Sequence, residues 1–231
     1  MKRISVTLVG VALFALVQPA MAIPIVAISL DGSVDASDIT CGDGSAAPAG
    51  VICVSGGTST TLVYNEFLAG SKFGSFGNVV LTAVDASTDY VVELDQNSIE
   101  ASGAAGDLYL FSTEEFDFGL GDPSHLYGAI GGTTDGAVSY DVFVGTSAFD
   151  LATNLLSMVF APGGADAPFS AAQGGTATLL GSQWLTQVVH VSHTVAGNSS
   201  SNAIVKVSEP GTLALLAAGL LAGGFLRRKT A

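Results

Sequence analysis

The sequence predicts an all-β protein whose body is an antiparallel β-sandwich, with one helical segment expected at each end of the chain. The apolar runs of the body are short and are bounded by Asp, Gly, Ser or Asn, residues that favour turns. In residues 138–144 the side chains of Val138, Tyr140, Val142 and Val144 alternate with those of Ser139, Asp141 and Phe143. This is the period of a strand with one buried face. No stretch of the body keeps a helical period for more than about a dozen residues. Many short strands at this spacing are typical of a sandwich.

The expected strands follow one another with turn residues between them. Two segments are expected to differ: residues 62–68 show the best helical periodicity, and residues 162–175, rich in Gly, Ala and Pro, read as a loose loop. The expected strands are 25–30, 79–84, 90–94, 108–111, 138–144, 155–160, 184–195 and 203–207.

Residues 1–22 have the parts of a secretory signal peptide. Two basic residues precede an apolar run at 6–17, and Ala20 and Ala22 form a small-x-small cleavage site. A first membrane helix fits less well, because the run is short and is followed at once by proline and small residues. We expect the mature chain to begin near Ile23.

Residues 23–207 form the expected secreted domain and are strongly acidic. They contain nineteen acidic residues and two basic ones, a formal charge of −17. Such a surface repels phosphate backbones, which argues against nucleic acid as a partner. The acidity is typical of a soluble secreted protein, and it also attracts divalent cations.

Cys41 and Cys53 are the two cysteines of the chain, and a glycine-rich segment separates them. In an oxidising compartment we expect them to form a disulfide, which contributes about 3 kcal/mol for a loop of this size in the chain-entropy model. Zinc is a poorer interpretation because no CxxC pair and no nearby histidine is present.

Residues 208–231 are expected to form a short transmembrane anchor. The apolar part, with two preceding residues, makes a helix of about 24 Å, whereas the hydrocarbon core of a bilayer is about 30 Å thick. The segment can still insert if the bilayer thins or the basic side chains snorkel. The expected anchor residues are Leu213, Leu215, Leu216, Leu220, Leu221, Phe225 and Leu226, and the expected stop-transfer residues are Arg227, Arg228 and Lys229.

The order of these C-terminal parts resembles a known sorting signal. Ser208-Glu209-Pro210, a Leu/Ala/Gly-rich helix and three basic residues are similar to the PEP-CTERM sorting domain of exopolysaccharide-producing Gram-negative bacteria, although Ser208 stands where that motif usually has proline. The resemblance implies that exosortase, a membrane-embedded cysteine protease, processes the chain near the Glu-Pro step. It also implies a transient inner-membrane anchor, with the body first in the periplasm and then at the cell surface or outside the cell.

The histidines do not form an evident metal site. His190 and His193 are an HxxH pair, but on a strand they point to opposite faces and cannot easily chelate one metal ion. We expect His193 to be packed and hydrogen-bonded, and His125 to lie in a solvated turn.

The acidic residues suggest two candidate sites. Glu114, Glu115 and Asp117 follow an expected strand; a glycosidase needs two carboxyl groups across a cleft, but a solvated acidic edge that deters strand pairing is favoured. Residues 31–38 carry oxygen-bearing side chains at alternate positions, somewhat like a calcium loop, yet Ala36 stands where an EF-hand needs glycine. Calcium is therefore the one cofactor that the sequence leaves open.

Trp184 has two interpretations. It is expected to anchor the core, and the alternative is a flat platform for a sugar ring. With no catalytic constellation evident, the sequence favours a non-enzymatic exported protein with a structural or interaction role in an exopolysaccharide matrix. The alternatives are a secreted carbohydrate-binding module that uses Trp184 and, less favoured, a glycosidase that uses Glu114 or Glu115.

Overall fold

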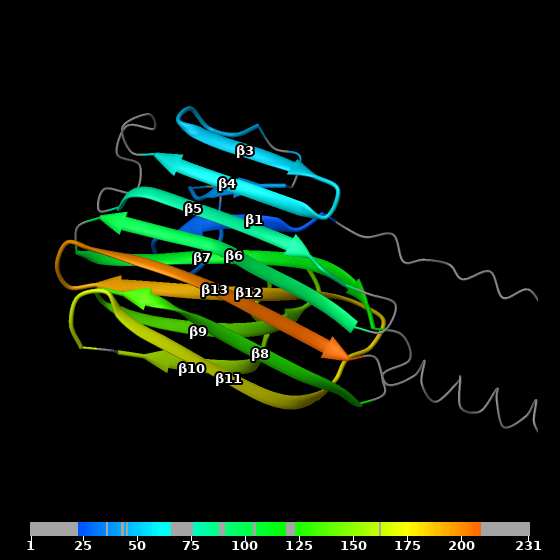
Figure 1. Ribbon diagram of the computed structural model, residues 1–231. Coiled ribbons are helices and arrows are strands. Elements are labelled where there is room, and N and C mark those ends of the chain that lie inside the picture. Colours follow the sequence, from blue (N-terminus) through cyan, green and yellow to red (C-terminus); the bar gives the residue numbers. More distant parts are fainter. Residues whose placement is uncertain are drawn as a thin grey trace, which may run out of the picture.

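The computed structural model describes residues 23–208 except 36, 43, 45, 66–75, 88–90, 104, 119–122 and 162. Every regular element in this part of the chain is a strand, and every strand pair is antiparallel (Figure 1), which confirms the predicted class. The two expected terminal helices lie outside the described residues. The strands are β1 (Ile25–Ser29), β2 (Ile39–Cys41), β3 (Val51–Gly56), β4 (Ser59–Asn65), β5 (Phe76–Asp85), β6 (Val91–Gly103), β7 (Gly106–Asp117), β8 (Pro123–Thr134), β9 (Ala137–Gly145), β10 (Thr153–Phe160), β11 (Ala167–Thr178), β12 (Ser182–His193) and β13 (Gly197–Ser208).

The strands form two sheets, which Figure 1 shows stacked face to face. The six-stranded sheet has the order β10-β9-β12-β7-β1-β2, and the seven-stranded sheet has the order β11-β8-β13-β6-β5-β4-β3. Consecutive strands such as β12 and β13 lie in different sheets, so the chain passes repeatedly from one layer to the other.

The main core lies between the sheets and is built by the alternation that the sequence shows. In β9, Val138, Tyr140, Val142 and Val144 are buried, whereas the residues between them are partly exposed. Both sheets contribute buried apolar side chains to one continuous cluster. Each large side chain buried in this way contributes roughly 1.5–3 kcal/mol.

Tyr140 connects the two layers through its hydroxyl group. This group lies 2.6 Å from Oε1 of Gln187 in the six-stranded sheet and 3.1 Å from the carbonyl oxygen of Ile204 in the seven-stranded sheet. The ring needs space beside β8, and Gly128 provides it. A Cβ atom on Gly128 would lie 2.6 Å from Leu156 Cδ1 and 3.3 Å from Tyr140 Cε1. The missing side chain therefore permits the close approach of the sheets.

The predicted disulfide between Cys41 and Cys53 is present, with 5.7 Å between the Cα atoms. Cys41 ends β2, an outer strand of the six-stranded sheet, and Cys53 belongs to β3, an outer strand of the seven-stranded sheet. The bond therefore joins the two layers along one edge.

The outer face of the six-stranded sheet carries a second, smaller apolar cluster. Ala27, Phe111 and Val188 are buried there, under Phe149 and Leu151 from the segment that follows β9. The rings of Phe111 and Phe149 meet edge to face, with 6.1 Å between their centroids. This cluster fills part of that outer face.

Two segments that the sequence predicts as a helix or a loop are partly strands in the structure. The expected loop at 162–175 is wrong from residue 167 onward, because β11 pairs with β8 along its whole length. Pro168 is tolerated because β11 is an edge strand. The helical expectation for 62–68 is wrong for 62–65, which lie in β4 between β3 and β5; residues 66–68 lie outside the described part of the chain.

Candidate functional site

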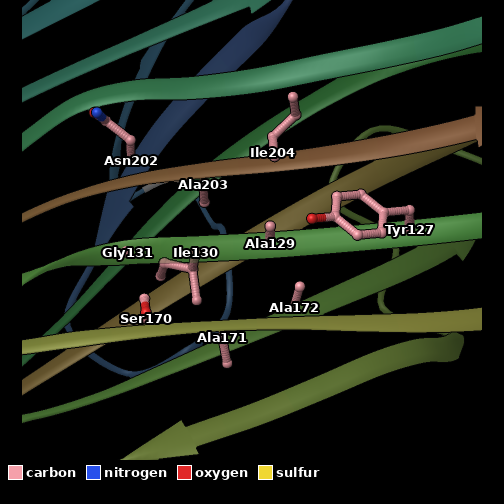
Figure 2. Close-up of a pocket in the computed structure, with 10 residues that line it drawn as sticks. All are labelled: Tyr127, Ala129, Ile130, Gly131, Ser170, Ala171, Ala172, Asn202, Ala203 and Ile204. Atoms are coloured by element: carbon pink, nitrogen blue, oxygen red, sulfur yellow. The ribbon is translucent and has the colours of Figure 1, made fainter.

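The seven-stranded sheet carries an open depression on its outer face. It has a volume of about 580 Å³ and spans the neighbouring strands β11, β8 and β13. Figure 2 shows the lining residues, which are Tyr127, Ala129, Ile130, Gly131, Ser170, Ala171, Ala172, Asn202, Ala203 and Ile204.

Small side chains form the floor of this depression. Ala129 of β8 lies opposite Ala172 of β11 on one side and opposite Ile204 of β13 on the other. Gly131, two residues further along the same face, lies opposite Ser170. Because Ala and Gly project little above a sheet, the surface is low between the taller side chains around it.

Tyr127 forms one end of the depression and is 46% exposed. In Figure 2 the hydroxyl end of its ring points along β8 toward Ala129. Lys206 of β13 lies opposite Tyr127, and its Nζ is 2.8 Å from Oε2 of Glu93. A charged pair therefore borders the aromatic end.

The lining of the depression suits binding. A flat ring and a low apolar floor can contact the face of a sugar ring, while Asn202 and Ser170 can exchange hydrogen bonds with hydroxyl groups. Among the described residues that line it, none is an acid or a histidine. The depression is therefore suited to a neutral, hydroxyl-rich ligand.

Trp184 lies on the outer face of the other sheet, so the expectation of a core anchor is wrong. It belongs to β12, where its neighbour Leu185 points into the core and Trp184 consequently points outward, partly exposed. Its partners across the sheet are Glu115 and Gly145. The structure does not bring Trp184 and Tyr127 together.

The expected solvated acidic edge is wrong for Glu114. The segment belongs to β7, which lies between β12 and β1 and is not an edge strand. Glu115 and Asp117 are exposed, but Glu114 is fully buried and points into the interior. Burial, and after it the carboxylate of Asp85, raise the pKa of Glu114 to about 9. Asp85 also acts on Glu114 through a side-chain hydrogen bond, which favours the protonated form of Glu114. No described residue donates a hydrogen bond to either Glu114 oxygen.

His193 is packed as expected. It is 3% exposed, and its Nε2 lies 2.8 Å from the hydroxyl of Ser199, which in turn lies 2.6 Å from that of Thr134. Burial lowers the pKa of His193, while the negative charge of Asp135 acts in the opposite direction. His125 is exposed, as expected, but it lies in β8 and not in a turn.

His190 points to the opposite face of β12, as the strand period predicts. Its ring stacks on Tyr109 with 4.1 Å between centroids, and its Nε2 lies 2.9 Å from Asp107 Oδ1. The hydroxyl of Ser192, and after it His190, lower the pKa of Asp107. Because the carboxylate lies between the hydroxyl and the imidazole, these groups do not form a nucleophile with its base.

The acidic loop at 31–38 uses its carboxylates locally. Asp31 Oδ1 accepts hydrogen bonds from the N–H and the hydroxyl of Ser33, and Asp35 Oδ1 accepts the same two from Ser37. These bonds lower the pKa of Asp31 and of Asp35. Within the described part of the chain, no three Asp, Glu, His or Cys side chains converge as metal ligands.

Ser208 is the only residue of the expected sorting motif among the described residues. It ends β13, and its hydroxyl donates to the carbonyl oxygen of His125 at 3.4 Å. The expected signal peptide (1–22) and the remaining motif, anchor and stop-transfer residues (209–231) lie outside the described residues. In the part that the structure describes, no helix has the length and apolar character to cross a bilayer.

A family model of the PEP-CTERM protein-sorting motif matches residues 206–229 of this chain. The matched segment therefore begins inside β13, at Lys206, and continues through the expected anchor and its basic end. No curated protein matches the sequence.

Several solved structures match part of this chain at low similarity. The CBM36-1 domain of a multidomain xylanase from the hindgut metagenome of Trinervitermes trinervoides is 13% identical, with a TM-score of 0.30, over 49% of this chain and 79% of that one. The K1 cleaved adhesin domain of Lys-gingipain from Porphyromonas gingivalis W83 is 12% identical, with a TM-score of 0.33, over 56% and 90%. TmCBM61 in complex with beta-1,4-galactotriose is 10% identical, with a TM-score of 0.29, over 60% and 90%. Values this low support no assignment of function.

Proposed function

We propose that this chain, which carries a PEP-CTERM sorting motif, is an exported surface or extracellular-matrix protein that exosortase processes. The match of the motif to residues 206–229 carries the proposal. The tail holds the chain in the inner membrane with the β domain in the periplasm. Cleavage near Glu209-Pro210 then releases or transfers the domain to the cell surface.

The described domain has features suited to this route. Its strongly acidic composition favours solubility outside the cell. The disulfide between Cys41 and Cys53 requires an oxidising compartment such as the periplasm to persist. The domain acts in the matrix by binding or structure and not by catalysis.

Removal of the tail tests the sorting proposal. A chain that stops after Ser208 keeps all of β13 but lacks the anchor. We expect it to accumulate in the periplasm, whereas the full chain reaches the surface. A full-length chain with Arg227, Arg228 and Lys229 changed to glutamine serves as a second variant and should be anchored and processed poorly. Equal surface display of the truncated and the full chain would contradict the proposal.

The outer depression supports a second candidate function, the binding of a neutral polysaccharide. The specific observation is the half-exposed ring of Tyr127 beside the low floor that Ala129 and Ala172 form. Sugar rings present one apolar face and a rim of hydroxyl groups, and this surface offers a ring, a flat floor and the polar side chains of Asn202 and Ser170.

Binding to a glycan array, or retardation in gels that contain the exopolysaccharide, tests this candidate. We expect Tyr127→Ala to lose binding by tenfold or more, because stacked aromatic contacts carry much of the energy at such sites. Trp184→Ala is the matched control, since it removes a partly exposed aromatic ring from the other sheet. Loss of binding in Trp184→Ala with full binding in Tyr127→Ala would place the binding site on the six-stranded sheet. That result would refute the proposal that the depression binds the polysaccharide.

A further inference from the structure

Glu114 is the least satisfied polar side chain of the described interior. It is 0% exposed, and no described residue donates a hydrogen bond to either of its carboxyl oxygens. Buried polar groups are almost always paired, and an isolated buried carboxylate is costly. The neighbour that acts on Glu114 among the described residues is Asp85, another acid, so the ionised carboxylate of Glu114 has neither a donor nor a cation beside it.

Further oxygen atoms lie at the same end of the interior. Asp85, 4% exposed, ends β5 in the facing sheet and is the charged group that acts most strongly on Glu114. Thr60 of β4 is 0% exposed, and its hydroxyl also has no partner among the described residues. Thr60 lies opposite Ala83, two residues before Asp85, so that both side chains occupy the inner face of the same two strands.

The chain around Gly42 brings a carbonyl oxygen to this group. A Cβ atom on Gly42 would lie 2.6 Å from the carbonyl oxygen of Pro24 and 3.1 Å from the hydroxyl oxygen of Thr60. Both oxygens therefore lie close to the backbone of Gly42, and this approach is possible because residue 42 is glycine, with a φ of 100°. Pro24 precedes Ile25, which pairs with Thr113, the neighbour of Glu114. The adjacent Cys41 is fixed by the disulfide.

We propose that the carboxylates of Glu114 and Asp85, the hydroxyl of Thr60 and the carbonyl of Pro24 bind one calcium ion between the two sheets. All four ligands are oxygen atoms, the donors that hard cations prefer. Ion binding displaces the proton of Glu114, and the two carboxylates then balance the charge of a divalent ion. Calcium accepts irregular sets of six to eight oxygens, whereas magnesium requires near-ideal octahedral geometry. The ion ties β7 of one sheet to β4 and β5 of the other.

This site is separate from the acidic loop at 31–38, where the sequence leaves calcium open. The carboxylates of Asp31 and Asp35 in that loop already accept hydrogen bonds from neighbouring serines. The two oxygens of Glu114 accept none from the described residues. In the interior group, Asp85 Oδ1 accepts a hydrogen bond from the N–H of Ser87, so the acceptors that remain unused there are the oxygens of Glu114 and the hydroxyl of Thr60.

Calorimetric titration of the full-length protein, first treated with EDTA and dialysed, tests the proposal. With CaCl₂ we expect one ion bound per chain, with a dissociation constant on the order of 10⁻⁴–10⁻³ M, as in extracellular calcium modules. The melting temperature should rise by several degrees and saturate over the same concentrations. An equal response to MgCl₂ would overturn the assignment to calcium.

Three variants assign the site. Glu114→Gln keeps the shape of the side chain without its charge, and we expect it to fold and to lose calcium binding. Thr60→Val, which replaces the hydroxyl with a methyl group, should weaken calcium binding by about tenfold or more, because it removes one oxygen ligand. Glu115→Gln, which changes the adjacent exposed carboxylate, should bind calcium as the wild type does. No saturable binding by the wild type, or unchanged binding by Glu114→Gln, would overturn the proposal.

Discussion

Glu114 and Glu115 are adjacent in the chain, yet their carboxyl groups lie on opposite faces of the six-stranded sheet, one buried and one exposed. The strand period of two is the cause. A glycosidase needs two carboxyl groups that face the same glycosidic bond, so these two cannot act as such a pair. The hydroxyl of Ser182 donates to Glu115, whereas no described residue donates a hydrogen bond to the oxygens of Glu114.

We accordingly expect no glycoside hydrolysis that depends on either residue. The measurement is turnover of exopolysaccharide and of chromogenic glycosides by the wild type and by the two Glu→Gln variants. Hydrolysis by the wild type that falls at least a hundredfold in Glu115→Gln would contradict this expectation.

Two adjacent glycines in β8 should differ sharply in their tolerance of a side chain. A Cβ atom on Gly132 would collide with the carbonyl oxygen of Ser200, a backbone atom that cannot move without breaking the sheet. A Cβ atom on Gly131 would lie no closer than 3.5 Å to any neighbour. We expect Gly132→Ala to cost roughly 2–4 kcal/mol of unfolding free energy and Gly131→Ala less than about 0.5 kcal/mol. Denaturant unfolding of both variants measures the difference, and equal losses would show that the register of β8 and β13 is wrong.

The disulfide joins the edges of the two sheets, so its removal should destabilise the domain. The double variant Cys41→Ser, Cys53→Ser should lose about 3 kcal/mol of unfolding free energy. Reduction of the wild type with dithiothreitol should give a similar loss, and the same treatment should leave the double variant unchanged. Equal unfolding free energies of the wild type and the double variant under oxidising conditions would contradict the structural role of the bond.

His193 should make stability fall on mild acidification. Burial lowers its pKa in the folded protein, so the unfolded chain takes up a proton more readily. The stability that neutral His193 contributes is present above the ordinary histidine pKa of about 6.5 and is lost as the pH falls through the folded value. Asp135 is the charged group that opposes this shift, and its own pKa is lowered by the N–H groups of Asp166 and Asn198.

Chemical unfolding at several pH values between about 7.5 and 5.5 measures this effect against His193→Gln, which cannot titrate. The wild type should lose more stability than the variant over this range. All other residues are the same in both proteins, so the difference between the two profiles reports on His193 alone. Parallel pH profiles would rule out the buried, neutral state of His193.

The sequence predicts strands best where apolar and polar side chains alternate. β9 is the clearest case, because Val138 to Val144 alternate and one face is buried. β8 and β11 were harder to predict, because glycine and alanine carry little strand preference and only the pairing with neighbouring strands extends them. The depression beside Tyr127 depends on which strands are neighbours, and this order is not written in any one segment.

The burial of Glu114 runs against the usual preference of charged residues for the surface. Its position could have been inferred from parity alone, since Leu108, Leu110 and Phe116 occupy the same face of the strand. A charged residue on a buried face is the kind of local conflict that marks a functional or strained position. Trp184 lies outside the core because it has the opposite parity to Leu185 on the same strand. Strand parity therefore explains the positions of both Glu114 and Trp184.

The intact mass of the protein recovered from the cell surface tests the sorting proposal most directly. In cells with an active exosortase we expect a chain that begins near Ile23, retains the Cys41–Cys53 bond and ends near Glu209, without the anchor. In cells without the protease we expect the same chain to keep its tail and to remain in the inner membrane. A full-length tail on surface protein from both strains would contradict the proposal.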